Sequence, residues 1–331
     1  MATIHYPVNR RRMRVSAQAR ELAATVSLNH RQFIQPVFVD AQLNAPRPLA
    51  NLPGVQAETT DSILRQVEQD IARGMHKFLL FPVPAEKQED PTDFSFSAEV
   101  IGRLKQVFGD DIWIAADCCL CAYTAHGHCG LLNAEGTAID NSASVHRLAD
   151  YALAMAQAGA DCIAPSDMMD GRIAAIRRRL DAQGKDTVTI MSYSSKFSSQ
   201  WYGPFRDACQ SSPKAAALRD RKSYQLSPAH PEDAVLSAVR DAAEGADMVM
   251  VKPAGWYGDI LLRVREQVDI PVSAYHVSGE YAALELMAAQ GLLSREAAHL
   301  ELWTALKRSG ADIIISYASR EARHWIEQQS C

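Results

Sequence analysis

The chain has 331 residues, of which 47% are hydrophobic and 22% are charged, and its formal net charge is −5 at pH 7. This apolar fraction excludes a disordered chain, and the mildly acidic balance argues against nucleic-acid binding. No run of about 18 uncharged apolar residues is present, and the basic N-terminus lacks an apolar signal segment. We therefore expect a cytoplasmic protein without a membrane or nucleic-acid partner. The length suggests about two domains, although one α/β barrel of this size is common.

The first segment, residues 1–30, is polar and rich in arginine and has no apolar face of its own. Segments of this kind at a chain end are often frayed, because little apolar surface holds them down. The alternative is an arm that becomes ordered on a neighbouring subunit. Both interpretations stay open on the residues alone.

Beyond residue 30, short apolar runs alternate with amphipathic helical stretches. Several runs are almost continuously apolar, which is typical of parallel strands buried on both faces. Three helical stretches end in Ala-Gly-Ala-Asp, Glu-Gly-Ala-Asp or Ser-Gly-Ala-Asp just before the next run, as a helix C-cap requires. Repeated strand–helix units predict a single (β/α)8 TIM barrel, and an open doubly wound sheet is disfavoured because no G-x-G-x-x-G follows the first strand. The predicted strands span residues 32–39, 77–83, 112–118, 161–166, 187–193, 247–253, 270–275 and 311–317.

One interval, residues 194–231, interrupts this alternation because it contains no clear periodic element. Long segments of this kind within a compact domain are usually lids or disordered loops. Its aromatic and basic side chains favour a lid over an anionic ligand, and a solvated basic loop is the alternative. The basic residues that favour the lid are Arg206, Arg219, Arg221 and Lys222.

The chain has seven cysteines, and four of them fall within twelve residues. Crowding of this kind in an intracellular protein favours metal or redox chemistry over a disulfide framework. In an extended segment, residues two apart share a face, so Cys119 and Cys121 are predicted to point together while Cys118 points away. Cys129 can return to them through a glycine turn. Three thiolates favour zinc, with a fourth position left open for catalysis.

Two histidines in the same loop, His126 and His128, could instead close the metal site with a fourth ligand. Redox-active or incidental cysteines are the remaining alternative for the cluster. The isolated cysteines, Cys162, Cys209 and Cys331, are interpreted as ordinary thiols.

Two lysines, Lys196 and Lys252, lie at or just beyond the ends of predicted strands. A lysine at the carboxyl end of a barrel strand points toward the usual active-site face. Lys252 emerges from an apolar run, so lost hydration and a second nearby ammonium both lower its pKa and free the amine to attack a carbonyl carbon. This predicts a Schiff-base nucleophile at Lys252. An exposed lysine or a phosphate binder is the alternative.

Seven longer motifs then follow one another along nearly the whole chain. They are Asp117-x-Cys-x-Cys with His-Gly-His-Cys-Gly up to residue 130, APSDMMDGR (164–172), MSYSSKF (191–197), YGPFRDA (202–208), DRKSYQ (220–225), MVKPA (250–254) and VSGEY (277–281). On these motifs the chain closely resembles the porphobilinogen synthase (5-aminolevulinate dehydratase) family, in its zinc-dependent type. The resemblance implies an N-terminal arm at residues 1–30, a catalytic (β/α)8 barrel over residues 31–331, a lid at about 198–225 between barrel strands 5 and 6, and a homo-octamer.

The resemblance also implies a lyase that condenses two molecules of 5-aminolevulinate into porphobilinogen, with loss of two waters, early in tetrapyrrole (heme) biosynthesis. Lys252 would hold the substrate of the acetate side as an imine, and Lys196 that of the propionate side. The zinc ligands would be Cys119, Cys121 and Cys129. The remaining matches are Arg206, Arg221 and Gln225 for the propionate-side carboxylate, Ser278 and Tyr317 for the acetate-side carboxylate, Asp117 and Ser166 as polar groups of the site, and Tyr202 and Phe205 as aromatic walls.

The chain departs from the family pattern at two places. Ser237 stands where some bacterial members carry the glutamate of a regulatory magnesium site, so an allosteric Mg2+ is predicted to be absent or weak. The loop at residues 87–96 does not follow the family pattern. Two other functions remain as alternatives, a class I Schiff-base aldolase and a non-catalytic zinc-binding assembly protein. An aldolase needs one imine lysine and no cysteine triad, and an assembly protein needs neither lysine.

Overall fold

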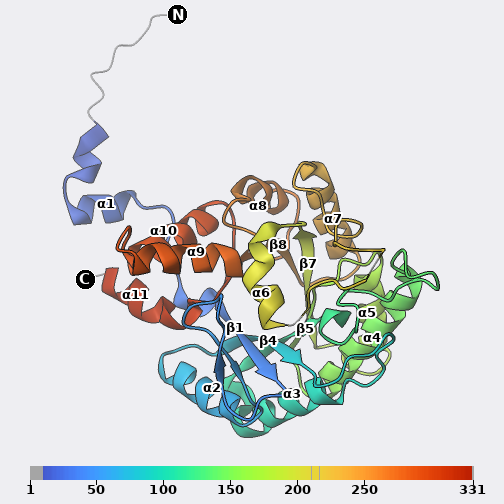
Figure 1. Cartoon of the computed structure of the whole chain (residues 1–331). Coiled ribbons are helices and arrows are strands. Elements are labelled where there is room, and N and C mark those ends of the chain that lie inside the picture. Colours follow the sequence, from blue (N-terminus) through green and yellow to red (C-terminus); the bar gives the residue numbers. More distant parts are fainter. Residues whose placement is uncertain (1–9, 210, 216, 330–331) are drawn as a thin grey trace, which may run out of the picture.

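The computed structural model describes residues 10–209, 211–215 and 217–329 (Figure 1). Eight parallel strands follow the order β1-β4-β5-β6-β7-β8-β9-β10, and β10 pairs back with β1, so the sheet closes on itself. This confirms the predicted (β/α)8 barrel, and each predicted strand has its counterpart. The barrel strands are β1 (Phe33–Asp40), β4 (Lys77–Val83), β5 (Trp113–Cys118), β6 (Cys162–Pro165), β7 (Thr189–Lys196), β8 (Met248–Lys252), β9 (Val272–His276) and β10 (Ile313–Ser316).

The barrel strands are buried on both faces because a ring of helices covers their outer side. Every residue of β1 is buried, for example, which explains why most of its residues are apolar. Helix α2, for example, turns an apolar stripe with Ile63 and Val67 inward. The helices are α2 (Ser62–Ala72), α3 (Ser95–Phe108), α4 (Asn141–Gln157), α5 (Arg172–Asp181), α7 (Pro231–Ala243), α8 (Gly258–Arg265), α9 (Ser278–Ala289), α10 (Arg295–Arg308) and α11 (Ala322–Gln329). Two short strands, β2 (Arg47–Pro48) and β3 (Gln56–Glu58), extend the sheet beside β1.

The interval without predicted periodicity lies between β7 and β8, which are the fifth and sixth barrel strands. It begins and ends side by side, because the Ser198 amide donates to the Leu226 carbonyl at 2.8 Å and the Leu226 amide donates to the Lys196 carbonyl at 3.0 Å. Contrary to prediction, it contains a short helix, α6 (Gly203–Ala208), which lies across the barrel mouth in Figure 1. We call residues 198–225 the lid.

The N-terminal segment forms a turn of 3-10 helix, Arg10–Arg14, and one α-helix, α1 (Ala17–Ala23). No residue of α1 is buried, and the helix stands outside the barrel wall (Figure 1). Residues 1–9 of the predicted arm lie outside the described residues. Within the described ranges, no helix combines the length and apolar character that crossing a membrane requires.

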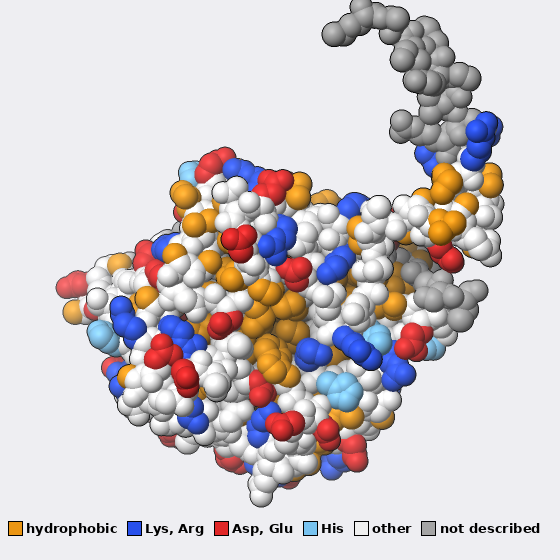
Figure 2. Space-filling view, turned by 180° about the vertical axis from the view of Figure 1, so that it is seen from behind, with side chains coloured by type: hydrophobic (Ala, Val, Ile, Leu, Met, Phe, Trp, Pro, Cys, Tyr) orange, Lys and Arg blue, Asp and Glu red, His pale blue; other side chains and the backbone are white. Residues whose placement is uncertain are grey.

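The end of the barrel away from the lid, where the strands begin, is closed by apolar side chains. These gather at the centre of Figure 2. A groove of about 250 Å³ runs between the first residues of several strands at this end. Its lining residues are Ile34, Trp113, Met248 and Ile313, with Arg31, Gln32 and Lys77 completing it. The polar residues predicted for the site lie at the other end, where the barrel strands end and the lid covers them.

Candidate functional site

Two buried lysines end the adjacent strands β7 and β8. Lys196 and Lys252 are direct partners in the register of these strands, and they are 5% and 4% exposed. The Lys252 amine lies over aromatic rings, 4.1 Å from the ring centre of Tyr275 and 4.8 Å from that of Tyr193. The Lys196 amine donates a hydrogen bond to the carbonyl oxygen of Ser166. Strand register therefore places two amines together, as the sequence predicts.

The electrostatic surroundings of Lys252 favour its neutral form. Burial, followed by the charge of Lys196, lowers the pKa of Lys252 to about 7. Burial likewise raises the pKa of Asp117 to about 6, although the two lysines oppose this shift. One carboxylate oxygen of Asp117 is buried without a hydrogen-bond partner. About half of the Lys252 amine is thus neutral near pH 7 and available for attack on a carbonyl carbon.

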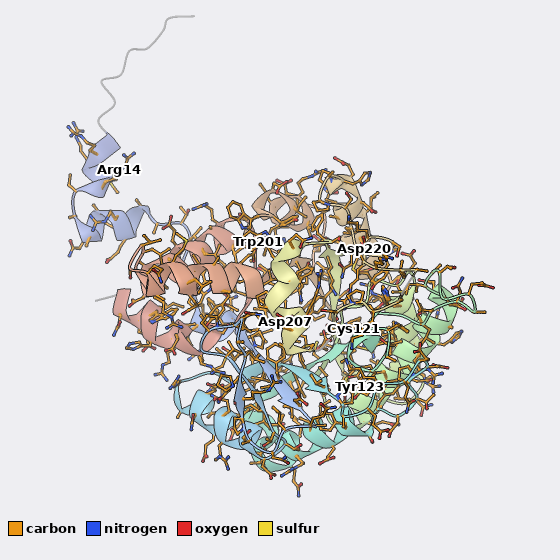
Figure 3. The ribbon with its side chains drawn as sticks, viewed as in Figure 1. Arg14, Cys121, Tyr123, Trp201, Asp207 and Asp220 are labelled. Carbon is orange, nitrogen blue, oxygen red and sulfur yellow. The ribbon has the colours of Figure 1, made fainter. Side chains whose placement is uncertain are left out.

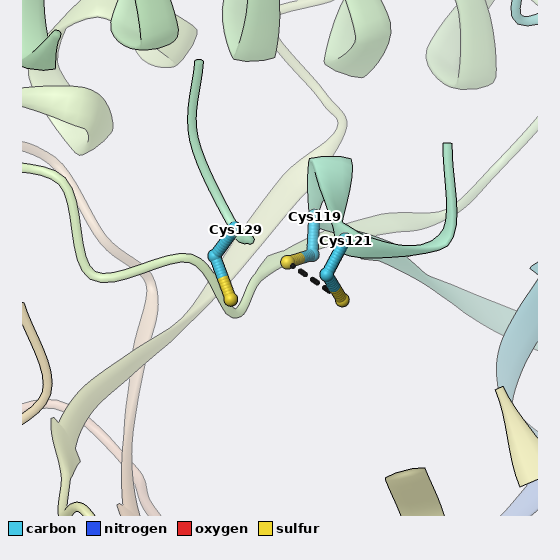
Figure 4. A group of neighbouring side chains, drawn as sticks. All are labelled: Cys119, Cys121 and Cys129. Atoms are coloured by element: carbon cyan, nitrogen blue, oxygen red, sulfur yellow. Dashed lines mark hydrogen bonds between the residues drawn. The ribbon is translucent and has the colours of Figure 1, made fainter. Parts of the chain in front are cut away.

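Three cysteine thiols form a second cluster at the end of β5 (Figure 4). The sulfurs of Cys119, Cys121 and Cys129 all lie within 4.8 Å of one another, and those of Cys119 and Cys121 are 3.3 Å apart. The prediction that these three thiols gather is confirmed, but its reason was wrong in part. Cys121 lies in a 3-10 turn, Leu120–Ala122, rather than in extended chain. The Cys118 thiol points elsewhere and donates to the Leu148 carbonyl at 3.6 Å.

The thiol cluster could hold a metal ion, and its spacing is compatible with tetrahedral coordination by thiolates. Tetrahedral coordination at a zinc–sulfur distance of about 2.3 Å separates the sulfurs by about 3.8 Å. Hydrogen bonds from Cys119 and Cys121 already hold the pKa of Cys129 well below its usual range. Both ring nitrogens of His128 have other partners, whereas His126 has one partner at Nδ1 and a buried Nε2 without one. The His128 ring contacts the Tyr224 hydroxyl at 3.0 Å and the Leu218 carbonyl at 2.8 Å, and His126 accepts from the His128 amide at 3.1 Å.

The lid rests directly on the thiol loop. The Lys214 amide donates to the His126 carbonyl at 2.9 Å, and the Arg221 guanidinium donates to the Gly127 carbonyl at 3.0 Å. Gly127 has a φ of +73°, and a Cβ atom there would lie 2.6 Å from the Ser212 carbonyl oxygen. Only glycine fits this turn, which explains the glycine of the His-Gly-His-Cys-Gly motif. A movement of the lid would therefore displace the loop that carries the thiols.

The polar side chains predicted to grip the propionate-side carboxylate all come from the lid. Arg221 and Gln225 are 5% and 3% exposed, and both polar atoms of the Gln225 amide lack a partner. Arg206 donates to the Ser199 carbonyl at 3.2 Å, and its Nε atom has no hydrogen-bond partner. Burial opposes the charge of Arg221, but the Cys129 thiolate raises the pKa of the guanidinium above its ordinary value. Buried donors without partners are costly unless a ligand satisfies them.

The residues predicted for the acetate side lie on the other flank of Lys252. Tyr317 directly follows the last residue of β10, and its hydroxyl lies 3.3 Å from the hydroxyl of Tyr275. Ser278 begins α9, and its hydroxyl accepts from the Phe205 amide at 3.1 Å and donates to the Trp201 carbonyl at 3.3 Å. The hydroxyl therefore contacts the lid, two of whose residues, Trp201 and Asp207, are labelled in Figure 3.

Aromatic rings complete the walls around the Lys252 amine. The predicted wall residues Tyr202 and Phe205 have ring centres 5.4 and 5.0 Å from this amine. Sequence reasoning missed Tyr193 and Tyr275, which come closer. Their positions in the sequence could have indicated a place in the site, because Tyr193 precedes Lys196 by three residues and Tyr275 ends a predicted strand. Such rings keep the site dry while their faces tolerate a cation.

The fold and the site together define a class: a (β/α)8 barrel with paired lysines and a thiol cluster at the carboxyl ends of its strands. The family model described as Delta-aminolevulinic acid dehydratase matches residues 8–325 of the chain. The chain therefore belongs to this family, as its motifs predict.

Relatives named delta-aminolevulinic acid dehydratase match nearly the full chain. The protein of Synechococcus elongatus is 38% identical over 327 residues, which cover 97% of this chain and 99% of that protein. The protein of Macaca fascicularis is 42% identical over 314 residues, which cover 92% and 94%. A crystal structure of porphobilinogen synthase from Toxoplasma gondii ME49, in complex with the reaction product porphobilinogen, aligns with a TM-score of 0.91 at 36% identity, covering 97% of this chain and 92% of that chain.

Proposed function

We propose that the chain is a lyase that condenses two molecules of 5-aminolevulinate into porphobilinogen with loss of two waters, early in tetrapyrrole (heme) biosynthesis. The observation that carries this proposal is the pair of buried lysines at the ends of β7 and β8. A condensation of two ketones needs two carbonyl-binding amines, whereas an aldolase needs one. Membership of a dehydratase family supports the same choice over an aldolase or an assembly protein.

Each lysine would hold one substrate as an imine. The amine attacks the ketone carbon, and the ketone oxygen leaves as water, so the substrate is tethered beside its partner. Tethering both substrates converts a bimolecular condensation into an effectively intramolecular one. Lys252 would hold the acetate-side substrate near Ser278 and Tyr317, and Lys196 the propionate-side substrate beneath the lid. Asp117 interacts with the charges of both amines. With its pKa raised to about 6, it would exchange protons with them.

The metal of the thiol cluster is proposed to be zinc, because three soft thiolates select it over harder cations. When bound, zinc would position the free amine of one substrate or polarise a carbonyl group. Three thiolates leave the site with a formal charge of −1, which favours amine positioning. The chain's own contribution is the buried, preformed arrangement of Cys119, Cys121 and Cys129.

An allosteric magnesium site is proposed to be absent or weak. Ser237 lies on α7, where its hydroxyl accepts from the Arg240 guanidinium at 3.1 Å. The same guanidinium binds Asp170 at 2.7 Å. A fixed cation of the chain thus takes the acceptors that a divalent ion would use at this position. Added magnesium should leave the activity of the zinc-loaded enzyme unchanged.

The proposed assembly is a homo-octamer in the cytoplasm, in which the arm of residues 1–30 packs on a neighbouring subunit. The arm supports this proposal because it exposes apolar side chains, with Val15 78% and Leu22 85% exposed. Deleting residues 1–30 should lower the assembled mass in sedimentation velocity. An unchanged mass would contradict the role of the arm.

The proposed function is tested by borohydride reduction in the presence of 5-aminolevulinate, followed by peptide mass spectrometry and by detection of porphobilinogen. We expect substrate adducts on Lys252 and Lys196 and release of the pyrrole. Adducts without the pyrrole would point to an aldolase. The absence of both adducts and product would contradict any imine mechanism.

The adduct on Lys252 should form fastest above pH 7. The nucleophile is the neutral amine, so a lysine with its pKa lowered to about 7 reacts at neutral pH, while an ordinary lysine needs pH above about 10. As pH falls below 7 the amine becomes protonated and the adduct rate drops about tenfold per unit. Single-turnover trapping between pH 5.5 and 9 measures this profile. A rate that still rises about tenfold per pH unit between pH 8 and 9 would contradict the lowered pKa.

Arg221→Lys should raise KM for 5-aminolevulinate by about 10- to 100-fold, because a bidentate charged hydrogen bond to the substrate carboxylate is lost. Lysine keeps the positive charge, so the effect reports the planar fork of the guanidinium. Steady-state kinetics measure it, with the exposed lid residue Arg219 changed to lysine as control. Equal KM values for the two variants would exclude Arg221 from the carboxylate grip.

A further inference from the structure

Glu280, the fourth residue of the VSGEY motif (277–281), has no part in the proposed chemistry, yet its carboxylate is buried. Its side chain is 5% exposed. One oxygen accepts from the Val277 amide at 3.0 Å, which is the usual contact of a glutamate in the first turn of a helix. The other oxygen accepts from the Gly255 amide at 3.0 Å, outside its own helix. A helix cap alone explains the first contact and not the second.

The second contact matters because of where Gly255 lies. It is the third residue after Lys252, in the turn that joins β8 to α8. The same turn is fixed to β9 by the Ala254 amide, which donates to the Tyr275 carbonyl at 3.1 Å. Trp256 of this turn stacks on Trp201 of the lid, with ring centres 5.9 Å apart and planes 17° apart. The turn therefore connects the Lys252 strand end, the Tyr275 strand and the lid.

The turn and the carboxylate fit each other closely. A Cβ atom on Gly255 would lie 2.9 Å from the nearer oxygen of Glu280, so only glycine lets the carboxylate approach. The burial of Glu280 raises its pKa to about 7 even though backbone amides hold the charged form. A buried carboxylate is costly unless backbone donors satisfy it, and here both oxygens have such donors.

We propose that Glu280 is a positioning residue for Lys252, which clamps the turn after β8 against the start of α9. The clamp holds the Lys252 amine over Tyr275 and Tyr193, and it holds Ser278, two residues before Glu280, in contact with the lid. This inference rests on the proposed function only in that Lys252 forms the imine. Glu280 acts through the backbone and does not touch the substrate.

The test compares rates of single-turnover borohydride trapping with 5-aminolevulinate at Lys252 and at Lys196 in the full-length, zinc-loaded protein. Glu280→Gln keeps the side-chain size but replaces one acceptor with a donor that faces a backbone amide. Gly255→Ala keeps the carboxylate and pushes it away. Both variants should slow the Lys252 adduct by about tenfold or more, because a charge-assisted hydrogen bond is lost, and should leave the Lys196 adduct rate unchanged.

The matched control is Glu58→Gln at the end of β3, a glutamate that is 3% exposed and accepts from the Ser62 hydroxyl at 2.5 Å. It should leave both adduct rates unchanged. Equal slowing at both lysines, with a lowered melting temperature, would show a purely structural role and overturn the proposal. Unchanged Lys252 trapping in both variants would overturn it as well. A wild-type protein without any adduct would instead contradict the proposed function itself.

Discussion

Replacing Lys252 with methionine should reduce porphobilinogen formation by on the order of 10⁴-fold or more, as expected for removal of a covalent catalytic group. Methionine has a similar length and is apolar, so it can pack against the rings of Tyr275 and Tyr193 without leaving a large cavity. What is lost is the amine whose pKa burial lowers to about 7. Stopped assays of the pyrrole measure the loss, and circular dichroism checks that the barrel still folds.

The matched control for this variant is Lys77→Met. Lys77 begins β4 at the opposite end of the barrel, and burial followed by the charge of Arg31 lowers its pKa as well. It is therefore a desolvated lysine without access to the site, and its loss should leave turnover unchanged. In the Lys252→Met protein, borohydride should still trap substrate on Lys196. Retention of more than about a hundredth of the activity would contradict covalent catalysis by Lys252.

The barrel strands could be predicted because their burial on both faces leaves continuous apolar runs, such as Met-Val-Met-Val before Lys252. The end of β7 could not, because its last residues are Ser194, Ser195 and Lys196, and a register shift lies between Ser192 and Ser195. The lid helix α6 was also missed. It has only six residues, starts with Gly-Pro and packs against α9, so tertiary contacts rather than periodicity stabilise it.

The residues of the site can likewise be divided into those that the sequence could predict and those that it could not. Lys252 and the cysteine cluster were predictable because strand ends and close spacing in sequence determine where they lie. Tyr275 and Glu280 were not, because their importance comes from contacts with a neighbouring strand and its turn. The histidine alternative needed the structure, because among the described residues the ligand atoms close enough to share a metal ion are the three thiols and neither histidine, while Tyr224 and Leu218 occupy the His128 ring. Sequence patterns locate groups on one element, whereas contacts between elements decide what each group faces.

Cys129→Ser should abolish metal binding and turnover together. The Cys129 thiol is fully buried, and hydrogen bonds from Cys119 and Cys121 hold its pKa well below the usual range, so it is the sulfur most disposed to be a thiolate. A serine hydroxyl stays protonated and is a poor ligand for a soft site. Loss of a direct ligand should weaken zinc binding by more than the ~100-fold that loss of an outer-shell partner costs. Metal analysis after dialysis measures this independently of activity.

Cys118→Ser separates metal binding from folding of the loop. Cys118 lies in the same segment and is equally buried, but its thiol contacts the Leu148 carbonyl on the other face. Its change should therefore leave the zinc content and turnover intact, with at most a loss of stability from burying a more polar hydroxyl. If both variants lost zinc equally, the effect would belong to the loop and not to the ligand set. If neither lost it, the thiol cluster would not be the metal site.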